Sequence, residues 1–269
     1  MTAPAIYRQA WVSLAVLAGA FGVMNVAFDA LVEEFDDTST ATLGWVLTGY
    51  TTVTTAVLIA AGRIADTYGR RRVLLSGLVV YVVTSAMGAV AWTPAVLIGA
   101  RVGQSIGAAL VTPASLALLL TILPGSRRST VIGLWGAIGA VAAATGPAVG
   151  WLIVGEMGWR WVFWLNLPFC ILALLAGWAW IEENIVSDGE GLPDILGIVI
   201  SAIAVGSLAV GFAQSGQWGW GDRRTVVALV VVLLFMAGFS AMNLNNVLFL
   251  SRVWGYSRVG PAWASPRVH

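Results

Sequence analysis

Charged side chains are rare in this chain, and their densest group lies between two long apolar runs. The stretch from Gly62 to Arg72 reads Gly-Arg-Ile-Ala-Asp-Thr-Tyr-Gly-Arg-Arg-Arg, in a sequence that is 59% hydrophobic. Each of its arginines would cost about 2.5–3.5 kcal/mol at the centre of a membrane helix, so the group marks a membrane boundary. Asp66 lies next to three arginines, which allows charge pairing, and Gly62 and Gly69 allow tight turns. An ordinary basic loop is the alternative, but it explains neither Asp66 nor the glycine spacing.

A second polar group lies inside an apolar run. Four residues share one helix face at 100° per residue: Arg101, Gln104, Ser105 and Ala108. Three glycines lie roughly opposite and form a ridge for close helix packing: Gly99, Gly103 and Gly107. We expect a polar stripe on a water-filled cavity and a smooth stripe on a neighbouring helix. An intramembrane arginine is a functional candidate, and the alternative is a structural arginine paired with a carbonyl or an acid.

Two further polar residues, Asn25 and Asp29, are four apart near the end of the first apolar run and share a helix face. Asp29 would serve there as a cavity carboxylate. The alternative is an interfacial acid whose side chain reaches the membrane surface.

Enzyme chemistry has few residues to use. The chain has one cysteine, Cys170, and one histidine, His269, which is the last residue. Cys170 lies inside an apolar run and His269 at the end of the chain, so we expect no Cys-His pair and no common zinc cluster, and no paired intramembrane aspartates are visible. We expect no enzymatic activity, no metal and no cofactor, and no basic tract suggests nucleic acid as a partner.

The composition predicts an all-α polytopic membrane protein. Only 10% of residues are charged, against about 25% in soluble domains, and the mean hydropathy is +0.87. Eight spans are predicted near 10–32, 43–62, 73–92, 95–122, 131–154, 161–181, 192–213 and 225–250. The first has no small-residue cleavage site and is expected to be a retained helix.

The arginines predict the orientation. With a cytoplasmic N-terminus, ten of them lie on the cytoplasmic side and three outside, while Arg101 lies within a span. Tryptophans such as Trp159 and Trp161 are expected at the outer interface. The predicted location is the plasma membrane, with multiple spans and a cytoplasmic N-terminus.

Three motifs resemble the major facilitator superfamily of secondary transporters. Residues 62–73 resemble its loop motif between helices two and three, with Thr67 in place of a basic residue. Residues 101–108 resemble its fourth-helix motif, with Ser105 in place of a glycine. Gly146-Pro147-Ala-Val-Gly150 resembles the fifth-helix motif of its antiporters, whose Gly-Pro pair bends the helix and allows tight packing.

The resemblance implies a six-helix bundle of inverted 3+3 repeats, and the two spans that follow it are typical of the fourteen-helix drug:proton antiporter subgroup. Residues 24–29 resemble the first-helix motif of the subgroup, with Asp29 in place of a proline and Gly19 where an acid is usual. By resemblance, Asp66 and Arg70, beside Arg71, form a latch on one face. Arg101, Gln104, Asn25 and Asp29 then serve proton coupling or line the cavity.

The domain organisation expected from this resemblance has four parts. Residues 1–181 form the transporter bundle, 182–191 a cytoplasmic linker, 192–250 two accessory helices, and 251–269 a tail that indicates truncation. The implied function is proton-coupled efflux of hydrophobic or cationic drug-like compounds through the lipid bilayer. The alternative is a non-transporting remnant, or a half-unit that requires a second half or a homodimer.

Overall fold

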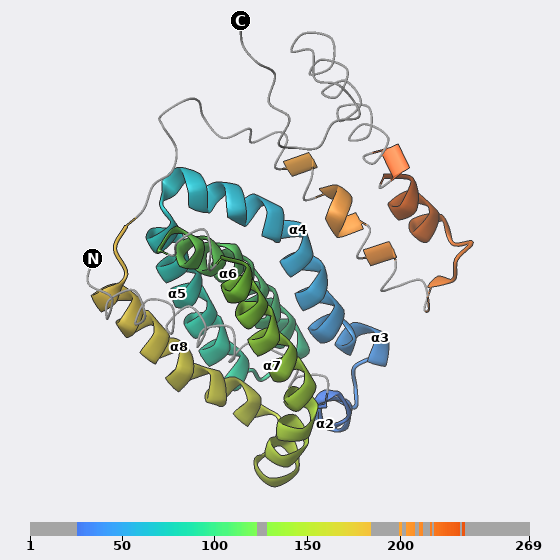
Figure 1. Ribbon diagram of the computed structural model, residues 1–269. Coiled ribbons are helices and arrows are strands. Elements are labelled where there is room, and N and C mark those ends of the chain that lie inside the picture. Colours follow the sequence, from blue (N-terminus) through green and yellow to red (C-terminus); the bar gives the residue numbers. More distant parts are fainter. Residues whose placement is uncertain are drawn as a thin grey trace, which may run out of the picture.

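Our computed structural model describes residues 26–122, 128–183, 199–200, 203–207, 210–211, 216, 218–231 and 233–234. Within these ranges every regular element is a helix, which confirms the predicted all-α membrane fold. The labelled helices (Figure 1) are α2 (Phe28–Glu34), α3 (Thr40–Leu43), α4 (Trp45–Tyr68), α5 (Arg70–Ala89), α6 (Pro94–Ile122), α7 (Arg128–Met157) and α8 (Arg160–Trp180).

Four of the described helices, α5 to α8, are long and apolar enough to cross a membrane. A fifth candidate is the bent pair Thr40–Leu58 and Ala60–Tyr68, whose axes differ by 48° (Figure 1). These five helices coincide with the predicted spans between residues 43 and 181. Of the first predicted span, the structure describes only the end, where α2 lies.

The connection between α4 and α5 is shorter than predicted. Gly62 lies inside α4 and not in a loop, because the helix continues to Tyr68 and α5 begins at Arg70. Gly69 alone makes the turn, with φ +104°. A Cβ on Gly62 would lie 3.9 Å from the Pro113 Cβ, so this glycine is part of the contact between α4 and α6.

Helix α6 packs against both α4 and α5, and α8 lies along α5 (Figure 1). Two buried clusters hold these helices together. One surrounds Leu74, Leu78 and Leu118 near the Gly69 turn. The other surrounds Leu31, Leu97 and Phe163 near the end of α2. We call the two ends of the bundle the Gly69 end and the Glu34 end.

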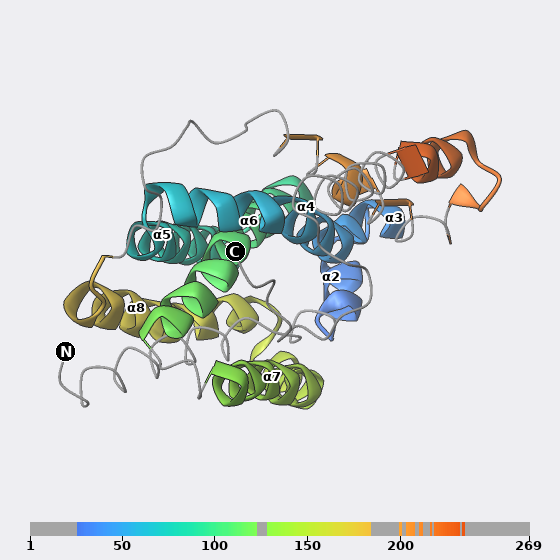
Figure 2. The same ribbon diagram turned by 45° about the horizontal axis from the view of Figure 1, so that its top comes forward.

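Helix α7 is the least buried of the spanning helices. Only 12% of its apolar window is buried, against 50% in α6. Figure 2 shows it on the side of the bundle remote from α4. Large apolar side chains are exposed along it, including Val141, Trp151 and Leu152. Such a surface is stable only against lipid or against another protein surface.

Short helical pieces lie beside α4 at residues 203–207, 210–211 and 223–231 (Figures 1 and 2). They fall on the two spans predicted for 192–213 and 225–250. The linker after residue 183 and the tail 251–269 lie outside the described residues.

Candidate functional site

A row of polar side chains connects α4, α6 and α5 inside the bundle. Arg101 Nε donates to the Val46 carbonyl of α4 (3.1 Å), and Arg101 Nη1 donates to Gln104 Oε1 (2.9 Å). Gln104 Nε2 in turn donates to Ser85 Oγ of α5 (2.7 Å). The Arg101 Cζ lies 4.1 Å from the centre of the Tyr50 ring, which is a cation–π geometry. Two side chains of α6, Arg101 and Gln104, therefore connect this helix to α4 and α5.

The charge of Arg101 is compensated by neutral groups only, as far as the described residues extend. A carbonyl, an amide oxygen and an aromatic face surround the guanidinium, and no carboxylate of the described residues forms an ion pair with it. Removing a charge from water costs several kcal/mol unless other groups replace the lost hydration. The positive charge therefore remains available to attract a carboxylate or to repel a cation.

Two residues of the predicted polar stripe of α6 are buried between helices, and its role in lining a water-filled cavity stays a prediction. Gln104 and Ser105 are fully buried, and Ser105 Oγ donates to the Val102 carbonyl of its own helix (2.6 Å). The glycine ridge is confirmed for Gly103 and Gly107, which contact α5 at Thr84 and Tyr81. Gly103 and Gln104 both face α5 because neighbouring residues are only 100° apart and the contact is wide.

Asp66 and Arg70 pair with each other across the Gly69 turn. Arg70 Nε and Nη2 donate to Asp66 Oδ1 at 3.0 and 2.8 Å. Arg70 Nη1 also donates to the Ala117 carbonyl of α6 (3.2 Å). The pair therefore fixes the end of α4 and the start of α5 on α6.

The start of α5 is capped by a residue that follows α8. Glu183 Oε1 accepts from the Arg71 backbone N–H (3.0 Å), and Oε2 accepts from the Arg72 backbone N–H (3.2 Å). Arg71 Nη2 donates back to the Trp178 carbonyl (2.8 Å). A carboxylate at a helix N-terminus satisfies orphan N–H groups and stabilises the helix dipole. This clamp holds the end of α8 on the start of α5.

A second carboxylate clamp lies at the Glu34 end. Glu34 accepts from Trp159 Nε1 (2.6 Å) and from Arg160 Nη1 and Nη2 (2.9 and 2.6 Å). Arg160 Nη2 also donates to the Ala91 carbonyl between α5 and α6 (3.1 Å). The bond from Arg160 lowers the pKa of the Glu34 carboxyl most; partial burial acts against this, and Trp159 adds to the lowering. Trp159 is buried here against Glu34, and its position at the outer membrane interface stays a prediction.

The Glu34 clamp predicts a stability loss in acid. A carboxyl whose pKa is lower in the folded chain stabilises the fold above its unfolded value, here 4.5, and this contribution is lost as the pH falls through the folded value. We expect the thermal unfolding midpoint of the wild-type chain in detergent to fall more steeply below pH 4.5 than that of Glu34→Gln. The exposed neighbour provides the control, since Glu33→Gln should keep the steep fall. Parallel curves for the wild type and Glu34→Gln would contradict the assignment.

The remaining predicted site residues lie apart from the Arg101 row. Asp29 is exposed in the first turn of α2, and Asn25 lies outside the described residues. Gly146 and Gly150 are buried in α7, whereas Pro147 is exposed and α7 continues through it without a break. Tight packing at the motif stays a prediction, whereas Gly133, Gly136 and Gly139, on the preceding turns of α7, have open space beside them.

Comparison with known proteins shows which kind of protein uses these helices. The sequence profile of the Major Facilitator Superfamily matches residues 10–265, nearly the whole chain. The chain belongs to this superfamily. It is thus a multi-pass membrane protein of a transporter family and not of an enzyme family.

Several relatives of this facilitator chain carry names that refer to antibiotics. The tetracenomycin C resistance and export protein of Streptomyces glaucescens is 33% identical over 84% of this chain and 43% of its own length. The lincomycin resistance protein LmrB of Bacillus subtilis (strain 168) is 29% identical over 86% and 49%. The cephamycin export protein CmcT of Amycolatopsis lactamdurans is 33% identical over 82% and 46%. The facilitator chain therefore spans about half the length of the curated relatives that it matches.

Three residues that contact the Arg101 row or the start of α5 were not predicted from the sequence. Ser85 and Tyr50 complete the Arg101 row, and Glu183 caps α5. A signal existed only for Glu183, because the predicted topology places it on the same membrane side as the arginines of residues 70–72. Ser85 and Tyr50 carry no such signal, since single hydroxyls are common in membrane spans.

Proposed function

We propose that this facilitator chain provides the N-terminal half of a drug exporter of the fourteen-helix subgroup, one that exchanges hydrophobic or cationic compounds for protons. The names of the relatives support the substrate class, since they refer to resistance against or export of antibiotics. The Gly146-Pro147-Gly150 motif supports exchange over symport. The arginine distribution supports an orientation with the Gly69 end in the cytoplasm, and we propose the plasma membrane as the location.

The Arg101 row is the observation that carries this proposal. Its guanidinium binds only neutral groups of the described residues, on α4 and α6, so its charge can respond to a carboxylate or to a substrate. A proton on a nearby acid removes the negative charge that Arg101 attracts, whereas a cationic substrate is repelled while Arg101 is uncompensated. Protons and substrate are then coupled through the same charge. Asp29, with Asn25, is the candidate acid; it lies apart from the Arg101 row in this structure, so this role requires α2 to approach α6 during the transport cycle.

The latch at the Gly69 end supplies the second requirement of alternating access. Asp66 and Arg70 join α4 and α5 to α6, and the Glu183 clamp joins α8 to α5. Four helices would thus move as one body, as rocking of one bundle against another requires. The surface against which they rock would be a second six-helix bundle, which a second copy of this chain would supply in vesicles that contain this chain alone.

Proton release from inverted membrane vesicles tests the proposal. Adding lipophilic cations to vesicles with the wild-type chain should release protons, and Arg101→Ala should reduce the flux by about 5- to 150-fold, the range of typical coupling free energies. Arg223→Ala removes an exposed arginine outside the row and should leave the flux unchanged. Equal flux from Arg101→Ala and the wild type would overturn the coupling role.

The second candidate function is a half-unit that transports only after assembly with a second half or a second copy. The exposed face of α7 favours it, because this helix has open glycines at 133, 136 and 139 and a window that is 12% buried. Absence of flux from the folded chain alone, with flux restored by coexpression of a C-terminal six-helix half, would favour this function. Absence of flux in both cases would indicate a non-transporting remnant.

A further inference from the structure

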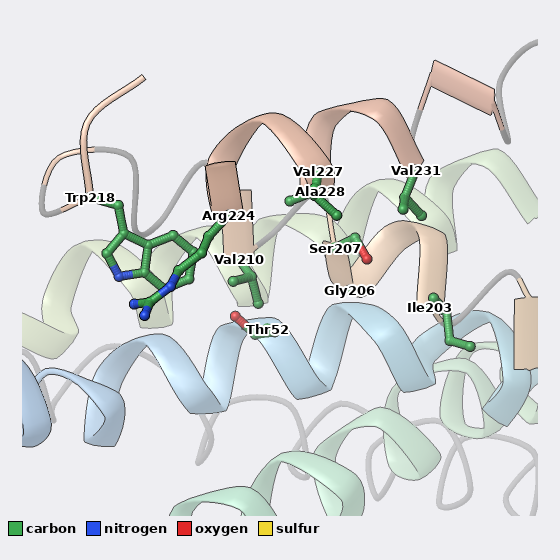
Figure 3. Close-up of a pocket in the computed structure, with 10 residues that line it drawn as sticks. All are labelled: Thr52, Ile203, Gly206, Ser207, Val210, Trp218, Arg224, Val227, Ala228 and Val231. Carbon is green, nitrogen blue, oxygen red and sulfur yellow. The ribbon is translucent and has the colours of Figure 1, made fainter. Parts of the chain in front are cut away.

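A cavity of about 560 Å³, widely open to the surface, lies between α4 and the segments 203–207, 210–211 and 218–231 (Figure 3). This volume is typical of a site for a small ligand. Six of its wall residues define its extent: Thr52, Ile203, Val210, Trp218, Arg224 and Val231. The cavity is separate from the Arg101 row, which lies on the contacts of α4 and α5 with α6.

Close packing surrounds this cavity. A Cβ on Gly206 would lie 3.2 Å from the Ala56 Cβ of α4, and a Cβ on Gly211 would lie 3.2 Å from the Ala228 Cβ. The pieces therefore contact α4 and each other through small residues. The cavity lies beside these contacts, between larger side chains of the same segments.

The two ends of the cavity differ in chemistry. Figure 3 shows Trp218 and Arg224 together at one end, with Ile203 and Val231 at the other. Arg224 Cζ lies 5.7 Å from the centre of the Trp218 ring, and no carboxylate of the described residues forms an ion pair with its guanidinium. Asp222 Oδ1 accepts from the Arg224 backbone N–H instead (2.7 Å). An arginine and a tryptophan at the end of an apolar space suit the headgroup region of a bilayer.

Thr52 provides an independent indication of a ligand. Its side chain lies in the cavity wall on α4, it is 9% exposed, and its Oγ1 has no hydrogen-bond partner among the described residues. A buried hydroxyl without a partner costs about 1–3 kcal/mol. An ester carbonyl of a lipid would accept from this hydroxyl.

We propose that this cavity binds an anionic phospholipid, with its phosphate at Arg224 and Trp218, its ester carbonyl at Thr52 and an acyl chain toward Ile203 and Val231. The positive charge of Arg224 favours an anionic lipid, because it attracts a phosphate and repels the lipophilic cations expected as substrates. The lipid would bind α4 to the accessory pieces. This inference does not depend on the proposed transport function.

Native mass spectrometry of the intact chain, titrated with phosphatidylglycerol and with phosphatidylcholine, tests the proposal. We expect retained phosphatidylglycerol on the wild type and about fivefold weaker binding by Arg224→Gln, since one basic residue contributes about 1 kcal/mol to binding of anionic lipid. Arg223→Gln is the matched control, because Arg223 is an exposed arginine outside the cavity wall. Val227→Trp, which fills the cavity, should weaken the binding of both lipids.

Three results would overturn this assignment. Equal losses in Arg223→Gln and Arg224→Gln would indicate attraction to the general surface charge. Equal binding of the two lipids by the wild type would exclude headgroup recognition by Arg224. Displacement of the lipid by a lipophilic cation, with binding of that cation weakened by Val227→Trp, would identify the cavity as a drug site. Thermal unfolding of each variant in detergent verifies that it is folded.

Discussion

Replacing Gly69 by alanine should destabilise the folded chain by about 1–3 kcal/mol from backbone strain alone. Gly69 has φ +104°, a conformation that side chains with a Cβ rarely adopt. A Cβ there would also lie 2.6 Å from Glu183 Oε1, which caps the start of α5. The variant must therefore strain the turn and displace the carboxylate that holds α8 on α5. Unfolding in detergent by titration with sodium dodecyl sulfate measures the loss.

Gly158 separates the two contributions to this effect. It has φ +88°, but a Cβ there would meet no atom within 4 Å. Gly158→Ala should therefore show the strain without the displaced carboxylate, and Gly69→Ala should cost more. In a chain that already carries Glu183→Ala, Gly69→Ala should cost no more than Gly158→Ala costs, because the carboxylate that the new Cβ would displace is absent. Equal losses in both single variants would show that Glu183 does not hold the turn.

The membrane spans were predictable because their signal is local. Runs of about twenty apolar residues predict helices wherever they occur, and α5, α6, α7 and α8 lie within a few residues of the predicted bounds. The turn between α4 and α5 was less predictable. Gly62 and Gly69 are the same residue type on either side of Asp66, and only the packing of α4 on α6 decides which of them makes the turn.

The site was predictable in its residue types but not in its contacts. Arg101 and Gln104 do interact, as their spacing on α6 predicts. The direction in which Gln104 points depends on Ser85 of α5, nineteen residues earlier in the sequence. Glu183 is 112 residues from its partner Arg71. Such pairings depend on how the helices pack, which residue periodicity does not determine.

The two carboxylate clamps on α8, at Glu34 and Glu183, could not be predicted from the residue types alone. Glu34 binds the start of α8 at Arg160, and Glu183 follows its end and binds α5. Both carboxylates bind backbone or side-chain donors of a different helix, so each connects segments that are distant in sequence. Helix α8 is thereby fixed at both ends, while α7 between α6 and α8 keeps an exposed surface. This contrast identifies α7 as the helix whose surroundings change most if a second bundle or a second copy binds.

The contact between α5 and α6 gives the second large expected effect, at Gly107. A Cβ there would lie 2.8 Å from the Gly77 carbonyl oxygen and 2.9 Å from the Tyr81 backbone nitrogen. Backbone atoms cannot rotate away as a side chain can, so Gly107→Ala must separate the two helices. Overpacking of this kind costs about 1–3 kcal/mol. The separation should also weaken the bond between Gln104 and Ser85, which lies within one turn of Gly107.

Gly99 on the same helix gives the matched control with the opposite sign. It has open space beside it, so Gly99→Ala should stabilise α6 by about 0.5–1 kcal/mol through helix propensity alone. Detergent unfolding should therefore move in opposite directions for the two variants. Loss of proton flux in Gly107→Ala, with normal flux in Gly99→Ala, would show that transport needs close contact between α5 and α6. Stability unchanged in Gly107→Ala would mean that these helices lie farther apart than this contact requires.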